Sequence, residues 1–536
     1  MPAILGPSRF HVSSARCSLA LFLAAAAVAA LTFRDYGVTW DEPYHVRYGE
    51  RVLRYYASGF EDTEAVHKSN LRYYGALFDL TGALAERVSP FGAYETRHLL
   101  SALAGLAGVL GCCLLARSIG GNRAALLAAL LLLVTPRWWG HSFFNPKDIP
   151  FAAGYVWSLY CITRAIPTLP RIPPKLALLT GLAIGSTLAL RVGGVLLFFY
   201  LGLAMAIQLA HHFPRRGFGG ALATAGAQLK SLSMVAVPAW GLMLLFWPWA
   251  QSRPIRAPFE ALSLMSQFVW RGTVLFEGRD FHVTEIPRRY MIEWLAITLP
   301  EIILLGLGLG LAIVLYRAVK GEIRLHAEKV PELALVIFAA SFPLVYIAVR
   351  KPIVYDGMRH VLFVLPLLAV LAALAFDFAL ERLRPRAAGL ALGLGGVYLL
   401  YHLSILIRLH PYEYVYFNRL VGGLPGAYGR YETDYWGESY REAVELLVRR
   451  VASETEAPPP PYRVSLCSNP VSGTYFFPPY LSLAGNAEEA DFFIATTRFR
   501  CHESLDGDVL AVVERLGTPL AYVKDRRRLV PARRRH

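Results

Sequence analysis

The apolar stretch SLALFLAAAAVAALTF at residues 18–33 is followed closely by TWDEP at residues 39–43. The first stretch is uncharged and almost long enough by itself to cross a bilayer as a helix. The second places two adjacent carboxylates, Asp41 and Glu42, just beyond the end of that helix. Further apolar stretches of similar length recur as far as Ile407. The sequence therefore predicts a polytopic α-helical membrane protein with an acidic pair at the membrane surface.

The composition agrees with this class and argues against nucleic-acid binding. Apolar residues make up 55% of the chain and charged residues only 17%, a low share for a soluble globular protein. The formal net charge of +15 would suit a nucleic-acid partner, but the basic residues stand in short loops between apolar stretches. Cytoplasmic loops of membrane proteins have this basic character. We therefore expect membrane lipids, and no nucleic acid, among the partners.

About eleven transmembrane helices are predicted. Arg9 and Arg16 precede the first and place the N-terminus in the cytoplasm by the positive-inside rule. Ala27-Val28-Ala29 also resembles a signal-peptidase site, but the many later spans favour an uncleaved anchor. The expected spans are 18–33, 98–116, 124–136, a fourth ending at Arg164, 176–190, 192–210, 231–249, 295–316, 331–349, a tenth ending at Arg382, and 389–407.

This topology sends the short basic loops to the cytoplasm and a second group of charged residues to the opposite face. The residues expected on the external face are Asp41, Glu42, Lys147, Asp148, Arg191, Arg359 and His360. Informative charges that gather at one aqueous face of a membrane protein indicate a functional site there. The sequence thus predicts a site built from loops on one side of the bilayer.

The chain after Leu409 has a different character, with an aromatic-rich segment followed by short mixed elements. Ser439 is a candidate N-cap for an amphipathic helix that reaches Val451. Strand-like pieces are expected at 463–467, 491–496 and 519–523, and a helix-like piece at 507–516. This alternation predicts a small external α/β domain.

We divide the chain accordingly into a transmembrane region at 1–409, an external region at 410–524 and a basic tail at 525–536. The tail is expected to be disordered or to rest on anionic lipid. Cys467 and Cys501 are the two cysteines in polar sequence, and they can pair if this region faces an oxidising compartment.

The charged residues on the external face suit the transfer of a sugar from a phosphate-linked lipid. Such a reaction needs a base for the acceptor's proton, whereas the phosphate leaves already ionised and needs no acid. Asp41 is the candidate base, with Glu42 beside it as a substrate-binding residue. Asp148 can orient the acceptor, hold a cationic partner or help to bind a metal. The candidate phosphate-binding residues are Lys147, Arg191, Arg359 and His360.

Each residue also has a plainer interpretation. Thr39 and Glu42 have the spacing of a capping box, so the acids can simply begin a surface helix. Lys147 and Asp148 can be an interfacial ion pair, and Arg191 can extend to the headgroups. Other plain interpretations are that Arg359 and His360 bound a span and that the tyrosines and tryptophans form an interfacial belt.

Three short motifs resemble a bacterial subgroup of the GT-C glycosyltransferases. They are NPKDIP at 145–150, DGMRH at 356–360 and YWG at 435–437. The similarity is to glycosyltransferase family 39, the protein O-mannosyltransferase and aminoarabinose-transferase group, and it spans most of residues 18–450. The resemblance implies a GT-C fold, a polyprenyl-phosphate sugar donor and inversion at the anomeric carbon.

By this resemblance, Asp41 matches the family's catalytic acidic position and Asp148 its second acid, while Arg359 and His360 match its phosphate-binding groups more loosely. The chain lacks the β-trefoil insert of the mannosyltransferases and has its own C-terminal domain, so the acceptor stays open among glycan, lipid and protein. Members of this fold class differ in their need for a metal, so a divalent metal stays possible.

The sequence therefore predicts a multi-pass glycosyltransferase of the cytoplasmic (inner) membrane, with its active site and C-terminal domain on the periplasmic side. Two other classes remain open. A transporter would be expected to show internal repeats and charges near the bilayer midplane. A non-catalytic receptor or assembly factor would use the external domain for binding and would tolerate loss of Asp41.

Overall fold

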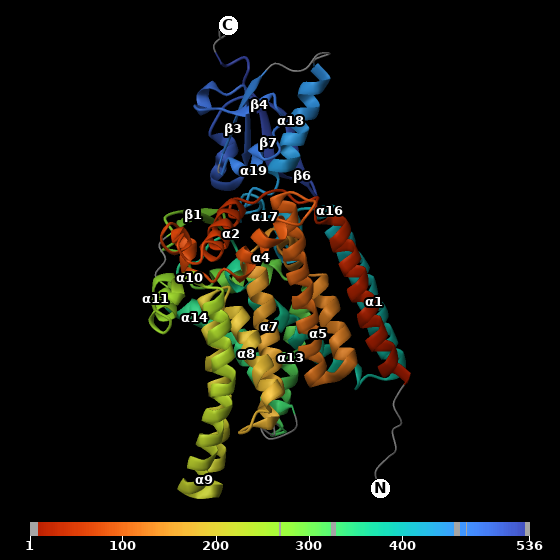
Figure 1. Cartoon of the computed structure of the whole chain (residues 1–536). Coiled ribbons are helices and arrows are strands. Elements are labelled where there is room, and N and C mark those ends of the chain that lie inside the picture. The colour runs from red at the N-terminus through yellow and green to blue at the C-terminus, as the bar shows by residue number, and fades with distance from the viewer. Residues whose placement is uncertain (1–8, 267–269, 323–328, 455–460, 468, 531–536) are drawn as a thin grey trace.

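A computed structural model describes residues 9–266, 270–322, 329–454, 461–467 and 469–530. It has three layers, a body of long helices, a middle layer of short helices and loops, and a C-terminal sheet at the far end (Figure 1). The first helix begins at the end of the body far from the sheet and finishes at the middle layer.

The long helices make this a multi-pass membrane protein. Within the described residues, eight segments are long and apolar enough to cross a membrane, judged by length and composition. They lie in the helices α1 (Arg9–Thr32), α5 (Ala93–Leu133), α9 (Val195–Leu245), α13 (Glu301–Val319), α14 (Val330–Arg350), α15 (Leu365–Leu380) and α16 (Pro385–Leu409).

Two of these helices each contain two of the predicted spans. Gly121 in α5 and Gly217 in α9 have φ angles of 83° and 63°, and the chain turns there from one helical segment into the next. Glycine adopts such angles without the penalty that a Cβ atom brings. The helices α7 (Asp148–Ala165) and α8 (Pro174–Leu188) match the remaining predicted spans. With 18 and 15 residues, they are shorter than the eight segments above.

Two predicted boundaries were wrong. The expected span 295–316 is interrupted at Leu299-Pro300, between α12 (Tyr290–Thr298) and α13. Proline breaks the helix there because it has no backbone N–H to donate to the preceding turn. The segment before residue 231, expected to be a loop, is already helical from the turn at Gly217 onward.

The middle layer contains the segments that surround the candidate site. Its helices are α2 (Glu42–Ala57), α3 (Glu64–His67), α4 (Leu77–Glu86), α6 (Pro136–Phe144), α10 (Pro248–Gln251), α11 (Arg256–Ser266), α12 and α17 (Gly423–Ala427). A two-stranded antiparallel hairpin, β1 (Thr273–Phe276) with β2 (Arg279–His282), joins them. Short 3-10 helices complete the connections of this layer: η1 (Asn70–Tyr73), η3 (Val192–Gly194), η4 (Arg359–Val364), η5 (Glu413–Val415) and η6 (Arg419–Val421). A further 3-10 helix, η2 (Ile166–Thr168), follows α7 at the end of that helix opposite to Asp148.

The C-terminal sheet has five strands in the order β4-β3-β5-β7-β6. The strands are β3 (Tyr462–Leu466), β4 (Leu481–Leu483), β5 (Phe492–Thr496), β6 (Asp508–Arg515) and β7 (Thr518–Asp525). β3 is parallel to β4 and β5, whereas β7 is antiparallel to β5 and β6. The helix α18 (Tyr440–Glu454) packs on the sheet, and α19 (Val471–Thr474), η7 (Ala487–Glu489) and η8 (Arg498–Glu503) lie in its connections.

The helix predicted at 507–516 was wrong, because this stretch is β6. It forms a hairpin with β7 through Leu516 and Gly517, whose φ angles of 52° and 73° are those of a type I′ turn. Valines along the stretch favour a strand. Hydrogen bonding to β7 stabilises this stretch as a strand, although its sequence pattern also fits a helix.

The expectation of a disordered basic tail was wrong for its first part. Arg526 is 3% exposed and pairs with Glu488, while Arg527 pairs with Asp525 and Glu454. The tail is thus folded against the sheet as far as Val530. Residues 531–536 lie outside the described part of the chain.

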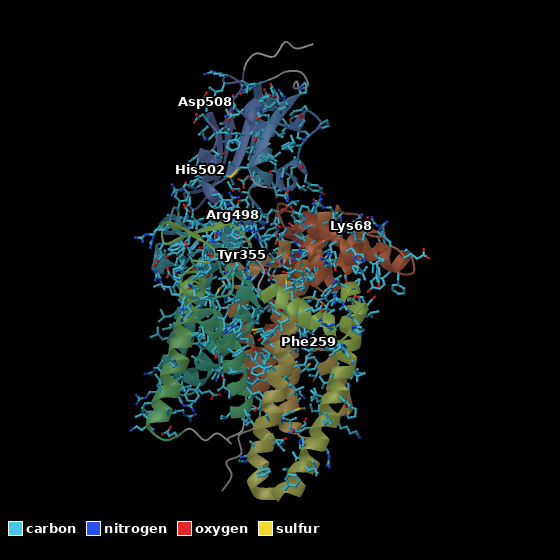
Figure 2. All side chains as sticks on the ribbon, turned by 90° about the vertical axis from the view of Figure 1, so that its left-hand side faces the viewer. Lys68, Phe259, Tyr355, Arg498, His502 and Asp508 are labelled. Carbon is cyan, nitrogen blue, oxygen red and sulfur yellow. A yellow bond between two sulfur atoms is a disulfide. The ribbon has the colours of Figure 1, made fainter. Side chains whose placement is uncertain are left out.

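A disulfide joins Cys467, at the end of β3, to Cys501 in η8, and this confirms the pairing predicted for these two cysteines. Figure 2 shows the sulfur–sulfur bond close to His502, near the end of the sheet that faces the membrane helices. The bond therefore ties together two connections on that side of the sheet.

We expect Cys467 and Cys501 to react with a maleimide only after reduction of the purified protein, because both sulfurs are held in the disulfide. Mass spectrometry of tryptic peptides before and after reduction measures this. The buried Cys112 serves as the internal control and should stay unlabelled while the protein is folded. Equal labelling of the pair before and after reduction would contradict the bond.

Candidate active site

The acidic pair lies at the start of α2, and its two carboxylates have different neighbours. Glu42 is 2% exposed, and its carboxylate accepts hydrogen bonds from the Thr39 N–H (2.7 Å) and hydroxyl (2.9 Å). Its other oxygen lies 2.8 Å from Nε2 of His98. Glu42 thus supplies half of the capping box that the spacing suggested, and it fixes the turn on which Asp41 stands.

Further contacts hold α2 in place behind this turn. His45 Nδ1 lies 2.9 Å from the Asp79 carboxylate of α4. Arg97 of α5 pairs with Glu86 and lies 3.9 Å from Asp79. These buried polar links join α2, α4 and α5 into one unit.

Asp41 faces the cations instead. Its Oδ2 lies 3.7 Å from Nζ of Lys147 and 3.8 Å from Nη1 of Arg359. Its side chain is 28% exposed, so it is the accessible acid of the site. Burial raises the pKa of Asp41, but Lys147 and then Arg359 more than offset this, and the pKa lies below its usual value.

Asp148 is the buried acid of the site, at 2% exposure. It forms an ion pair with Arg191, and its Oδ2 lies 3.6 Å from Nη1 of Arg359. The Asn145 amide also donates to this carboxylate at 3.2 Å, while the Asp148 N–H donates to the Asn145 side chain at 2.9 Å. Asp148 therefore holds cationic partners, one of the roles expected for it.

Arg359 connects the two acids. It is 4% exposed, and its guanidinium also approaches Asp356, with Nε 3.0 Å from Oδ2. The rings of Tyr355 and Trp436 lie 4.8 Å and 5.3 Å from its Cζ atom. One guanidinium thus contacts three carboxylates and two aromatic faces.

Lys147 and Arg191 share an aromatic neighbour that the sequence did not indicate. The ring centroid of Tyr74 lies 5.3 Å from Nζ of Lys147 and 5.8 Å from Cζ of Arg191. Burial lowers the pKa of Lys147, but Asp41 more than offsets this and leaves the pKa above its usual value. Both side chains therefore enter the site as cations beside one aromatic face.

His360 lies next to Arg359 in η4, and its ring makes an edge contact with Tyr355 at 4.9 Å between centroids. Its Nε2 is buried, and among the described residues it has no hydrogen-bond partner. Of the six other predicted site residues, Asp41 and Asp148 pair with Arg359, and Lys147 and Arg191 pair with these two acids. His360 lies beside them through its ring, and Glu42 bonds to Thr39 and His98 instead.

A second set of residues, which sequence reasoning missed, lies around the motif YWG. His141 Nε2 lies 3.0 Å from the Tyr435 hydroxyl, and Arg137 donates to the Tyr416 carbonyl at 3.3 Å. Burial, with help from Arg137, lowers the pKa of His141 to about 3, so this imidazole is neutral at physiological pH. Both basic residues stand in RWWGHSFF, just before NPKDIP, but no spacing in the sequence pairs them with Tyr435.

Two further missed residues are Asp356 and Arg498. Asp356 lies in the motif DGMRH, yet its role as the partner of Arg359 depends on the backbone there. Asp356 and Gly357 both have positive φ, 57° and 65°, and the chain turns so that the Asp356 and Arg359 side chains meet. Arg498 comes from η8, more than a hundred residues later, and no sequence signal links it to the site.

The residues present do not fit a bound divalent metal. Lys147, Arg191 and Arg359 already surround the carboxylates of Asp41 and Asp148. Within the described part of the chain, no group of three or more histidines, cysteines, aspartates or glutamates is arranged to hold one.

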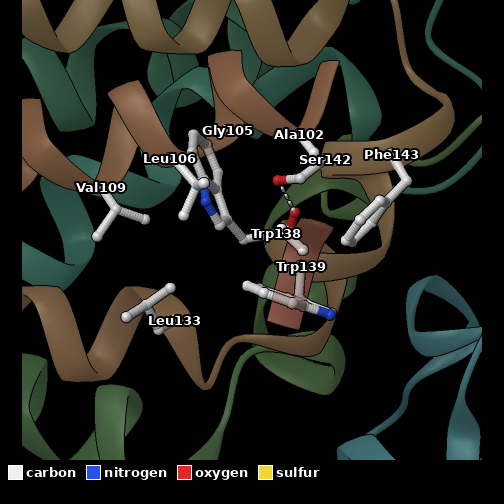
Figure 3. A pocket seen from close by; sticks show the side chains of 10 residues that line it. Ala102, Gly105, Leu106, Val109, Leu133, Trp138, Trp139, Ser142 and Phe143 are labelled. Carbon is white, nitrogen blue, oxygen red and sulfur yellow. Dashed lines mark hydrogen bonds between the residues drawn. The ribbon is translucent and has the colours of Figure 1, made fainter. Parts of the chain in front are cut away.

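The apolar pocket of Figure 3 lies apart from this charged cluster. It is lined by residues of α1, α5 and α6, among them Trp138, Trp139 and Ser142, whose hydroxyl donates to the Trp138 carbonyl. Its cavity of about 10 Å³ has no charged lining residue and is far too small for a sugar. The charged cluster is thus the better candidate.

Comparison with known proteins gives one match at the level of sequence families. Residues 95–240 match the family model described as dolichyl-phosphate-mannose-protein mannosyltransferase. The resemblance to the GT-C glycosyltransferases is confirmed over this segment. The matched segment includes Lys147, Asp148 and Arg191, and it supports glycosyl transfer as the activity. None of the curated proteins matches the chain in sequence.

Among solved structures, the chain is similar to ArnT from Cupriavidus metallidurans in the apo state, at 17% identity and a TM-score of 0.48, over 96% of this chain and 99% of ArnT. It is also similar to the Archaeoglobus fulgidus oligosaccharyltransferase, at 16% identity and a TM-score of 0.45, over 84% of this chain and 62% of that one. A third similar structure is the arabinosyltransferase EmbB from Mycobacterium smegmatis, at 16% identity and a TM-score of 0.43, over 70% of this chain and 31% of EmbB.

The ion pair between Asp148 and Arg191 should contribute measurably to stability, because its carboxylate is buried. A double-mutant cycle with Asp148→Asn and Arg191→Gln should give a coupling energy of about 1–3 kcal/mol, from free energies of unfolding in mixed micelles. The exposed pair Arg87–Glu50, 2.9 Å apart, is the matched control and should couple by less than about 1 kcal/mol. Equal coupling in the two pairs would contradict this assignment.

Proposed function

We propose that this protein transfers a sugar from a polyprenyl-phosphate-linked donor to an acceptor on the periplasmic side of the inner membrane, with inversion at the anomeric carbon. The observation that carries the proposal is the position of Asp41. It is a partly exposed carboxylate within 4 Å of two cations, Lys147 and Arg359, in a buried charged cluster.

Asp41 is proposed as the base. The acceptor hydroxyl gives its proton to Asp41 while its oxygen forms a bond to the anomeric carbon. The bond from that carbon to the phosphate oxygen breaks, and the lipid phosphate leaves with the electron pair. Because one carboxylate serves as base and none forms a covalent intermediate, a single displacement inverts the configuration.

The cations explain how Asp41 can act as a base although its pKa is low in the free protein. Lys147 and Arg359 lower this pKa because their charges face the carboxylate. A donor phosphate bound to the same cations would offset their charge and raise the pKa of Asp41 toward that of a more effective base. Donor binding and base activation are thereby coupled through electrostatics.

The same cations are proposed to stabilise the departing phosphate. Lys147, Arg191 and Arg359 stand within reach of the two acids from three different segments, and fixed cations around a leaving phosphate lower the barrier without reorganisation. His360, with its unpartnered Nε2, is proposed to contribute a hydrogen bond from the same side.

The remaining assignments follow from burial. Asp148 is proposed to orient Arg191 and Arg359, because both carboxylate oxygens already face cations. Glu42 is proposed to stabilise the turn that carries Asp41, rather than to bind substrate, because its carboxylate already contacts Thr39 and His98. The acceptor is a glycan, a lipid or a protein.

The topology and the division of the chain are also proposals. We propose a cytoplasmic N-terminus and a periplasmic external region at 410–524, after the transmembrane region 1–409. The positive-inside rule supports this orientation, as does the position of the candidate site in the layer next to the sheet (Figure 1).

Single cysteines introduced at Ser58 and Lys320 test the orientation in a variant that lacks the four free cysteines and keeps the disulfide. We expect Ser58→Cys to react with a membrane-impermeant maleimide in intact spheroplasts, and Lys320→Cys to react only after permeabilisation. Both side chains are exposed, so access to the reagent depends on the side of the membrane. The reverse pattern would overturn the proposed orientation.

Asp41→Asn should lower transfer by about 100-fold or more, because the amide cannot accept the acceptor's proton. The assay is transfer from a panel of polyprenyl-phosphate sugars to endogenous acceptors in membranes, at matched expression. Asp62→Asn changes a partly exposed acid beyond the other end of α2, and this control should keep wild-type transfer. Unchanged transfer by Asp41→Asn would show that Asp41 is not the base.

A further inference from the structure

Two loops of the C-terminal sheet reach the candidate site, and both touch residues that neighbour its charged groups. One loop is η8, which carries Arg498. The other follows β3 and carries Asn469. Figure 2 shows Arg498 and Tyr355 one above the other, between the sheet and the long helices. Through these loops the C-terminal sheet meets the site.

Arg498 acts on Arg359 through Asp356. Its Nη2 lies 2.6 Å from Oδ1 of Asp356, whose Oδ2 lies 3.0 Å from Nε of Arg359. Asp356 is fully buried, Arg498 is 6% exposed, and the Trp436 indole N–H also donates to Asp356 at 3.1 Å. A buried carboxylate held from two sides by guanidinium groups has little freedom to move. Arg498 therefore determines where Asp356, and through it Arg359, can lie.

The same loops also hold the residue before Asp41. The ring centroid of Trp40 lies 4.4 Å from Cζ of Arg498. The Asn469 side-chain amide donates to the Trp40 carbonyl at 2.9 Å, and the Trp40 N–H donates to the Trp436 carbonyl at 3.2 Å. Both backbone polar groups of Trp40 and its ring are thus occupied, which limits the rotation of the adjoining Asp41.

The disulfide joins these two loops. Cys467 is two residues before Asn469, and Cys501 is three residues after Arg498. Their Cα atoms are 6.1 Å apart. Neither loop can move away from the site independently of the other while the bond is intact.

We propose that Asn469, Arg498 and the disulfide Cys467–Cys501 form a clamp that positions the base Asp41 and the phosphate-binding Arg359 relative to each other. This inference rests on the proposed function and extends it. Arg498 and Asn469 are positioning residues, because they reach the reacting groups only through Asp356 and Trp40. The oxidised disulfide is then required for full activity although it contacts no substrate.

The expected effect is on turnover rather than on donor affinity. A displacement of about 1 Å in a reacting group is enough to lower a rate by about 100-fold. Lys147 and Arg191 lie outside the clamp and keep their charge for the donor phosphate, so the KM for donor should change less than kcat.

The test compares the full-length protein in nanodiscs in four forms, namely wild type, Arg498→Gln, Arg498→Lys and the double variant Cys467→Ser/Cys501→Ser. A further sample is wild type treated with a phosphine reductant. The phosphine reduces the disulfide to two thiols and is itself oxidised to the phosphine oxide, with the oxygen and both protons coming from one water. Arg500→Gln is the matched control, because Arg500 lies in the same η8 but is exposed and contacts Asp280 at 3.7 Å.

Two readouts are measured for each form. Hydrogen–deuterium exchange of the peptide that contains Trp40 should rise at least about tenfold in Arg498→Gln, in the double variant and after reduction. Without the loop contacts to its ring and carbonyl, Trp40 moves more freely and its N–H bond to Trp436 opens more often. With the polyprenyl-phosphate sugar that wild type uses, kcat should fall about tenfold or more, and KM should change by less than about threefold. Arg498→Lys should recover part of the turnover, and Arg500→Gln should match wild type in both readouts.

The outcomes separate this proposal from the function on which it rests. Unchanged exchange at Trp40 in the double variant and after reduction would overturn the clamp, whatever the activity. Faster exchange with unchanged kcat would overturn the positioning role. If wild type transfers no sugar from any polyprenyl-phosphate donor, the proposed function fails, and the exchange data still decide whether the loops hold the Asp41 segment. Should Arg498→Gln not fold, the reduced wild type and the double variant give the same decision.

Discussion

The guanidinium of Arg359 is the group on which the candidate site depends. It contacts Asp41, Asp148 and Asp356, which come from three separate segments of the chain. A buried charge without partners is strongly destabilising, so each of these carboxylates compensates the cost of burying the arginine. Arg359 in turn keeps Asp41 and Asp148 close together although both are negatively charged. The proposed base thus shares one cation with two other carboxylates, and Lys147 is its second cationic neighbour.

Each of the three layers contributes different charged residues to the surroundings of Arg359. The membrane helices bring Asp148, Arg191 and Arg359 to one end of the helical body, while the middle layer supplies Asp41 from the start of α2. The C-terminal sheet, through Arg498, supplies a cation to the third carboxylate. In the proposed reaction, a site made from loops of three layers would let the donor phosphate and the acceptor meet the protein's polar groups outside the hydrocarbon.

The electrostatics also suggest an order of events for the proposed reaction. In the free protein the cations keep the Asp41 carboxylate ionised and weakly basic. A bound phosphate would take up part of that positive field and make Asp41 a better proton acceptor. This arrangement restricts base activation to the donor-bound state and so protects the site from unproductive protonation.

Several features could be predicted from the sequence because they depend on local composition. The membrane helices follow from apolar stretches. The common location of Asp41, Lys147, Asp148, Arg191 and Arg359 follows from a topology that sends the short basic loops to the other face, and the two cysteines in polar sequence were the candidates for a disulfide. The β6 strand could not be predicted, because its pairing with β7 overrides a pattern that also fits a helix.

By itself, the sequence predicted which segments are apolar enough to cross the membrane and which charged residues share one face of the protein, since burial in lipid depends on hydrophobicity along a short stretch. Only the tertiary structure decided that Glu42 bonds to Thr39 and His98 while Asp41 faces Arg359. It also decided that Arg498 supports the site through Asp356. The physical reason is that the energy of an ion pair depends on the separation of the charges in space. These partners are far apart along the chain, so residue spacing does not show that they meet.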